Sequence, residues 1–231
     1  NTYHWQNRNI PMLKYQPDER LVLKNFQFDS DSQFVEINGV FSKALEDSVN
    51  YNIGNVNLQK ISDMMCGRIG FGGIMDGRFT TRTLTTVPTI QGDVDVEKLT
   101  LDGSIFGDVE IRSRYNQELN RFDTHLSVTT DSTKYPEYFA NNDRRGQQFD
   151  IDGYVLAPKE GNFPKVDSLF QFDVDFKNID LWILPLIGPK VFEEGAGLAT
   201  GTGLIWGNLE TYDFNADFMV GAEDAAYLRP K

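Results

Sequence analysis

The sequence has little cysteine and little positive charge, and each shortage excludes something. Among 231 residues the only cysteine is Cys66, so no intrachain disulfide can form. Lys and Arg number 22 against 34 Asp and Glu, which gives a net charge of −12. That sign opposes binding to the phosphates of nucleic acids and to anionic bilayer surfaces.

Long hydrophobic runs are also missing. No segment approaches the roughly 20 apolar residues that a membrane-spanning helix needs. The longest run, Leu181–Ile187, is interrupted by Pro185. The sequence also lacks an initiator Met and the hydrophobic segment of a signal peptide. We therefore expect a fragment or mature segment of a longer protein whose targeting and membrane-anchoring parts lie outside it.

What the sequence does contain, from Leu21 onward, is short runs in which apolar and polar residues alternate between turn-forming residues. In Phe170–Phe176, three phenylalanines and Val174 share one side of a strand, and polar residues share the other. Turn signals recur too often to leave room for the crossover helices that parallel strands require. The pattern predicts an all-β chain of successive antiparallel strands.

Few segments are typical of helices. We expect short helices at Leu58–Met65 and Pro136–Asn142, and a third at Leu181–Phe192 that its prolines must break or kink. Residues 1–20 form an N-terminal segment without clear periodicity, and residues 222–231 read as a C-terminal tail. Neither end of the chain carries a predicted site.

The chain contains an internal repeat. Val35–Phe41 is similar to Phe149–Val155, and Val49–Leu58 is similar to Phe172–Leu181. A short apolar segment and then a Gly-rich strand follow in both copies, and the spacing of the glycines fits no phosphate-binding loop. We place the first repeat at residues 21–92 and the second at residues 93–221, within one continuous β structure.

The order and duplication of these motifs resemble the TamB and AsmA-like family, in particular TamB proteins of the Bacteroidetes type. The unit begins with Phe149–Gly153 and continues with Phe172–Leu181; the strand Ile90–Gly103 ends a copy. The resemblance covers about Leu21 to Gly221. Because the chain holds roughly two repeats of a much longer array, it matches only a section of such a protein.

The resemblance implies a curled, folded-over sheet, the β-taco, which runs from the inner membrane through the periplasm toward the outer membrane. Its concave face is an apolar groove for phospholipid in transit between the two membranes. Family members also act with an outer-membrane barrel protein in outer-membrane biogenesis. No catalytic residue, cofactor or metal is implied, so we expect no enzyme.

In this sequence, the bulky residues that alternate into such a groove are seven phenylalanines: Phe122, Phe149, Phe170, Phe172, Phe176, Phe214 and Phe218. The candidate groove plug is the apolar helix, through Leu181, Trp182, Leu184 and Phe192. The ordinary alternatives are that the phenylalanines fill a packed core, and that the helix covers a sheet edge. A structural or adhesin-like module with a dry core and an interacting surface is the rival function.

Catalytic and metal sites have weak support. The only histidines are His4 and His125, and His125 is in phase with polar neighbours on a wet face. No nucleophile elbow and no zinc-binding spacing is present. The Asp pairs mostly alternate along strands, so they indicate a solvated face; a glycan-active enzyme would instead require a carboxylate pair in a cleft. Asp29–Ser32 is the one calcium candidate, and it lacks the later residues of a calcium loop.

Overall fold

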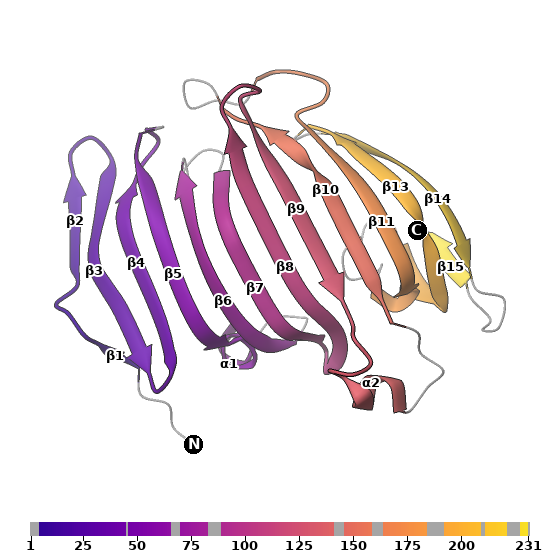
Figure 1. The fold of residues 1–231 in the computed structure, drawn as a ribbon. Coiled ribbons are helices and arrows are strands. Elements are labelled where there is room, and N and C mark those ends of the chain that lie inside the picture. Colours follow the sequence, from indigo (N-terminus) through magenta and orange to yellow (C-terminus); the bar gives the residue numbers. More distant parts are fainter. Residues whose placement is uncertain are drawn as a thin grey trace.

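The structure is a computed structural model, and it describes residues 5–44, 46–65, 70–82, 89–140, 146–158, 164–183, 192–208, 211–220 and 227–230. Its main feature is a 13-stranded antiparallel sheet (Figure 1). The strands of this sheet are β1 (Gln6–Asn7), β2 (Met12–Gln16), β3 (Arg20–Ser30), β4 (Gln33–Phe41), β5 (Ser48–Asn57), β6 (Phe71–Arg82), β7 (Thr89–Leu101), β8 (Ser104–Asn116), β9 (Arg121–Thr129), β10 (Gln148–Leu156), β11 (Phe170–Asp180), β13 (Leu198–Gly207) and β14 (Tyr212–Val220).

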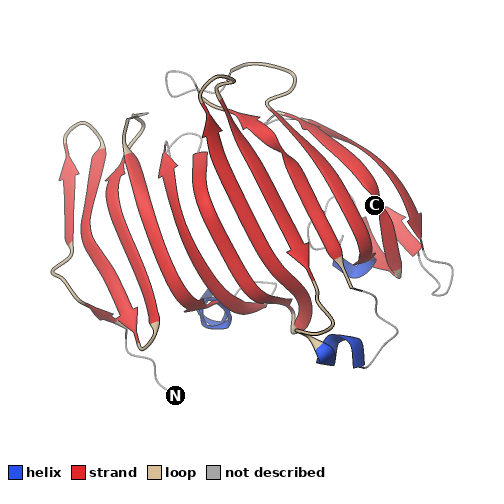
Figure 2. Cartoon of the chain, viewed as in Figure 1, coloured by secondary structure: helices blue, strands red, loops and turns tan. Residues whose placement is uncertain are grey.

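The sheet is a meander in which neighbours in sequence are neighbours in space. From β3 to β10 every strand pairs with the one before and the one after it, β11 pairs with β10 and β13, and β14 pairs with β13. Strands make up most of the chain, and helices are few and short (Figure 2). The prediction of an extended, curled antiparallel sheet is therefore confirmed.

Alternation along the strands divides the sheet into an apolar face and a polar face. Val96, Val109, Val128 and Phe149 are direct cross-strand neighbours on the apolar face. On the opposite face, Asp95 lies beside Glu110, Glu110 beside Ser127, and Ser127 beside Asp150. Side chains alternate between the two faces along each strand. The register that aligns the apolar residues on one face therefore also aligns the polar residues on the other face.

One helix covers part of the apolar face. Helix α1 (Leu58–Met65) directly follows β5, and its Leu58 packs with Val96, Val109 and Val128 in a buried cluster. Asn57 begins the helix, since its side chain accepts a hydrogen bond from the Gln59 amide at 3.0 Å. The helix lies toward the lower ends of the strands in Figure 1, as does α2 (Pro136–Ala140).

A recurring bulge gives the sheet a local bend in four strands. The register shifts in β3, β5, β7 and β11, each time around one residue with positive φ. These residues are Asn25 (60°), Asn55 (53°), Lys98 (53°) and Asn178 (52°). Bulges bend a strand and increase its twist, so their repetition across the sheet favours a curled layer over a flat one.

Each of these four bulges is held by the strand that follows. The amide of Asn25 donates to Asn38, that of Asn55 to Asp76, that of Lys98 to Asp108 and that of Asn178 to Thr200, at distances of 2.8, 3.0, 2.9 and 3.0 Å. The extra residue of a bulge cannot donate to the ladder, so a side chain replaces the missing acceptor.

The sequence repeat has a structural counterpart. The matching segments form β4 and β10, and then β5 and β11. Asn55 in β5 and Asn178 in β11 occupy equivalent positions in the repeat, and both are bulge residues with positive φ. After β5 the chain forms α1, and after β11 it forms the 3-10 helix η1 (Leu181–Ile183).

The structure adds detail to four of the expected segments. The helix expected at Leu181–Phe192 is described only at Leu181–Ile183, and Phe192 instead begins strand β12 (Phe192–Ala196), because its backbone pairs with β15 (Tyr227–Pro230). The expected C-terminal tail therefore contributes a strand. The N-terminal segment likewise forms β1 and β2, both of which pair with β3. Helix α2 is described as far as Ala140, and the expected end at Asn142 lies outside the described residues.

Candidate functional site

The cross-strand register brings the seven predicted groove phenylalanines onto the apolar face. Phe149 is opposite Phe176, and both Phe176 and Phe218 flank Gly201. Phe172 and Phe214 flank Ile205 in the same way. Phe122 and Phe170 lie on either side of Val155. The seven side chains therefore form one continuous aromatic surface from β9 to β14.

Their exposure rises from the middle of the sheet toward its C-terminal edge. Phe122 is buried, with 7% of its surface exposed. Phe149, Phe170, Phe172 and Phe176 are half-buried. Phe214 and Phe218 on the last strand expose 55% and 41%. Within the described residues, this part of the face is incompletely covered, so an apolar ligand or a second protein surface could contact it.

Glycines on the same face leave space for the rings. A Cβ atom on Gly153 would lie 2.6 Å from a ring carbon of Phe172, and one on Gly201 would lie 2.6 Å from the Cβ of Phe218. At Gly153 the backbone and the ring of Phe172 therefore occupy the space of a side chain, and at Gly201 the backbone and Cβ of Phe218 occupy it. Ring centroids of Phe170 and Phe172 are 5.9 Å apart, and those of Phe176 and Phe218 are 6.5 Å apart.

The candidate plug is only partly described. Leu181 is buried and Trp182 is half-buried in η1, whereas Leu184 lies outside the described residues. Phe192 belongs to β12 by its backbone, and its side chain is not described. The Leu181 amide donates to the Gly197 carbonyl at 2.9 Å, which ties η1 to the bend between β12 and β13. A role of this segment as a plug stays a prediction.

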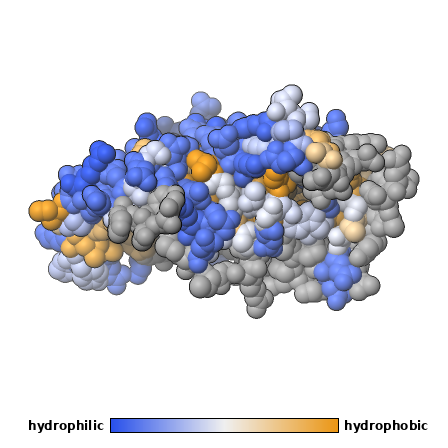
Figure 3. All heavy atoms as spheres, turned by 90° about the horizontal axis from the view of Figure 1, so that it is seen from below, coloured by the Kyte–Doolittle hydropathy of each residue, from blue (hydrophilic) through white to orange (hydrophobic). Residues whose placement is uncertain are grey.

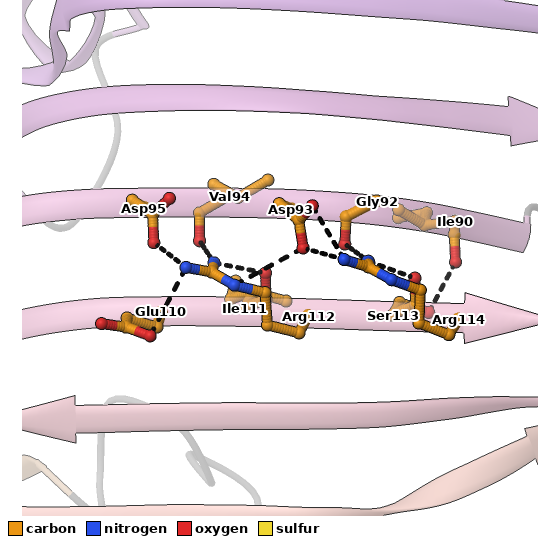
Figure 4. Close-up of polar contacts among 10 residues, drawn as sticks. All are labelled: Ile90, Gly92, Asp93, Val94, Asp95, Glu110, Ile111, Arg112, Ser113 and Arg114. Carbon is orange, nitrogen blue, oxygen red and sulfur yellow. Dashed lines mark hydrogen bonds and ion pairs between the residues drawn. The ribbon is translucent and has the colours of Figure 1, made fainter.

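The polar face carries a ladder of ion pairs between β7 and β8 (Figure 4). Arg112 bonds Asp95 at 2.5 Å and lies 3.4 Å from both Asp93 and Glu110. Arg114 contacts both carboxylate oxygens of Asp93, at 2.6 and 2.9 Å. Each guanidinium also donates to carbonyls of both strands. These arginines neutralise part of the acidic face. The alternation of residues predicted that the aspartates lie on this face, but it did not predict that Arg112 and Arg114 pair with them.

Further along the polar face, aspartates line a shallow depression of about 490 Å³ between β10 and β14. Its carboxylates come from Asp150, Asp152, Asp173, Asp175 and Asp217. His125 lies at its border, with Nδ1 2.7 Å from Asp152, on the wet face as expected. A carboxylate pair that divides acid and base roles needs two different environments. These aspartates share one open, hydrophilic surface, so the depression favours a solvated face over a catalytic cleft.

No metal-binding cluster is present in the part of the chain that the structure describes. The residues of the calcium candidate have structural roles within the chain. Asp29 pairs with Arg8 at 2.8 Å, and Asp31 lies in the β3–β4 turn with positive φ. Among the same residues, no helix has the length and apolar character to cross a bilayer.

A partly buried polar cluster ties the segment before α2 to the sheet. Asp108 accepts hydrogen bonds from Lys134 at 2.8 Å, from the Lys98 amide at 2.9 Å and from the Tyr135 hydroxyl. Burial of Asp108 opposes ionisation, but these bonds outweigh it and lower its pKa. Burial and the bond to Asp108 together raise the pKa of Tyr135 to about 12. The cluster is structural: it fixes the bulge of β7 and the segment before α2.

Seen from below (Figure 3), hydrophilic residues gather along one long side of the molecule, and hydrophobic residues show beneath them and at the end formed by the N-terminal strands.

Comparison with known proteins identified no relative. No protein-family model, no curated protein and no solved structure matches the chain.

Proposed function

We propose that this chain is a non-enzymatic section of a periplasmic conduit whose apolar face shelters the acyl chains of phospholipid. The observation that carries the proposal is the placement of seven phenylalanines on one face of one sheet, six of them half-buried or exposed. Apolar surfaces of this kind on soluble proteins typically mark interaction sites.

An acyl chain is well matched to this surface chemically. Each CH₂ group removed from water contributes about 0.8 kcal/mol, so an extended chain lying across several strands needs no hydrogen bond to be retained. The surface offers rings and glycines from β9 to β14 and few polar groups on the same side. Such binding would discriminate little between headgroups, as expected for bulk phospholipid.

The reverse face suits an aqueous compartment. Its aspartates and the arginine ladder stay hydrated while the apolar face holds lipid, and its net acidity opposes adhesion to anionic membrane surfaces. A carrier that moves lipid between two membranes, rather than remaining bound to one, would benefit from this asymmetry.

The resemblance to TamB and AsmA-like proteins supports the cellular setting of the proposal. It points to the periplasm, to inner-to-outer-membrane phospholipid transport, to outer-membrane biogenesis and to an outer-membrane barrel protein as partner. It rests on the duplicated motifs, and the bulges at Asn55 and Asn178 are consistent with that duplication.

A second candidate function is a structural or adhesin-like module that acts through its surface. The packing beneath α1 favours it, because Val96, Val109 and Val128 are almost fully buried there, with no room for a ligand. If the remaining apolar face were covered in the same manner, the chain would have a dry core throughout.

Native mass spectrometry after incubation with phospholipid vesicles separates the two functions. The proposal predicts bound phospholipid on the wild-type chain and its loss on Phe172→Asp. Gln171→Asp is the matched control, since it introduces the same charge on the same strand but on the polar face, and it should retain lipid. A wild-type chain that stays lipid-free, or equal loss in both variants, would contradict the proposal and favour the structural module.

A further inference from the structure

Both outer strands of the main sheet are free on one side. In the part of the chain that the structure describes, β14 pairs only with β13, and β2 pairs only with β3. An edge strand presents unpaired amide and carbonyl groups to a further strand, and proteins usually protect such edges with proline, bulges or brevity. Tyr212–Val220 contains no proline and pairs with β13 without a register shift.

Apolar residues are exposed at both of these edges. On β14, Phe218 and Phe214 expose 41% and 55%, and Met219 exposes 76%. On β2, Leu13 and Tyr15 expose 61% and 68%. Leu13 is opposite Leu23 and Phe218 is opposite Gly201, so both belong to the apolar face. That face therefore continues to both ends of the sheet.

The strand directions allow these two edges to meet. Because β1 and β2 share one position beside β3, the 13 strands occupy an even number of positions, and all neighbours are antiparallel. Strands β2 and β14 thus run in opposite directions. A second copy placed next to the first by a rotation and translation that continue the twist of the sheet brings its β2 antiparallel to β14, with both apolar faces on the same side.

We propose that copies of this chain associate head to tail, β14 of one pairing with β2 of the next. Pro11 and Pro17 bracket β2 and limit the contact to its five residues. In the best register, Lys14 is opposite Asp217, Leu13 opposite Phe218, Met12 opposite Met219 and Gln16 opposite Asn215. Opposite charges and apolar residues are thereby matched across the contact.

Charge favours this arrangement over a two-fold one. In a two-fold contact between the β14 strands of two copies, both strands carry Asp213 and Asp217. In a two-fold contact between two β2 strands, two copies of Lys14 meet. Like charges directly opposite are destabilising. A head-to-tail contact leaves one edge of each copy available to the next copy, so it repeats and lengthens the apolar face. It does not depend on the function proposed for that face.

Sedimentation velocity across a concentration series at physiological ionic strength tests the contact. The wild-type chain should associate in a concentration-dependent manner. Lys14→Glu and Asp217→Lys should each raise the dissociation constant roughly tenfold, and the double variant should restore association because the pair is reversed. Circular dichroism of each variant checks that the sheet is intact.

Other results overturn the proposal. A wild-type chain that stays monomeric at every concentration removes the contact altogether. Stronger association of Asp217→Lys alone would assign a two-fold β14 contact instead. Failure of the double variant to recover would show that Lys14 and Asp217 do not meet. None of these measurements involves lipid, so their outcome is separate from that of the conduit proposal.

Discussion

Two regions of the same apolar face differ in what lies over them. Beneath α1, Val96, Val109 and Val128 expose 8%, 7% and 2%. At the C-terminal end of the sheet, Phe214 and Phe218 expose 55% and 41%. The strands of both regions have the same alternating pattern. Alternation therefore decides which face of the sheet is apolar, but it does not decide how deeply each part of that face is buried.

The largest effect should come from charge placed in the covered region. Val128→Asp puts an unpaired carboxylate beneath α1 among side chains that exclude water, so we expect a loss of about 4 kcal/mol or more in the free energy of unfolding. Urea denaturation measures it. Ser127→Asn, an uncharged polar change on the polar face of the same strand, should change the stability by about 0.5 kcal/mol or less. Similar losses for the two variants would contradict the face assignment.

The next effect concerns the polar cluster beside the covered region. Asp108→Asn removes a charged acceptor from Lys134, Tyr135 and the Lys98 amide, and should cost about 2 kcal/mol at neutral pH. Because the folded-state pKa of Asp108 is lowered, the stabilisation is present above the ordinary value of 3.8 and is lost as the pH falls through the folded-state pKa. The wild-type advantage over Asp108→Asn should therefore shrink in acid. An advantage independent of pH would refute the ionised cluster.

A smaller effect is expected in the open region. Phe172→Asp removes a half-buried ring that water already reaches in part, so the expected loss is about 1–2 kcal/mol and the chain should remain folded. Thermal unfolding followed by circular dichroism measures it. Complete unfolding would show that the open region is packed as tightly as the region beneath α1, and the contrast between them would disappear.

The smallest effect belongs to the polar face. Arg114 and Asp93 expose 56% and 43% of their side chains, so Arg114→Ala should cost about 0.5 kcal/mol and less at high salt. Denaturation at two salt concentrations checks both statements. A loss that is large or insensitive to salt would mean that the ladder, rather than the apolar face, holds β7 to β8.

Strand alternation was sufficient to predict the sheet, the faces and the side on which all seven phenylalanines lie. The bounds of α1 were also predictable, since an apolar segment follows the end of β5. The bulge at Lys98 could not be predicted from the sequence. Lysine rarely adopts positive φ, and the conformation of Lys98 depends on Asp108 in the next strand. Strands β2 and β15 lack a pattern of their own and form through their partners.

The ion-pair ladder could not be predicted for a related reason. Arg112 and Asp95 are far apart in the sequence, and only the exact pairing of β7 with β8 makes them neighbours. Coverage of the apolar face is also a tertiary property. The sequence therefore predicted the chemical character of the candidate site, and the packing around it required the structure.

The most direct test of the central claim is photo-crosslinking with a phospholipid that carries a diazirine in its acyl chain, followed by residue-level mapping. An acyl-chain surface on the apolar face predicts adducts on Phe170, Phe172 and Phe176 and none on Gln171, Asp173 and Asp175, which alternate with them on the same strand. Equal labelling of both sets, or no labelling of β11 at all, would contradict an acyl-chain surface on the apolar face.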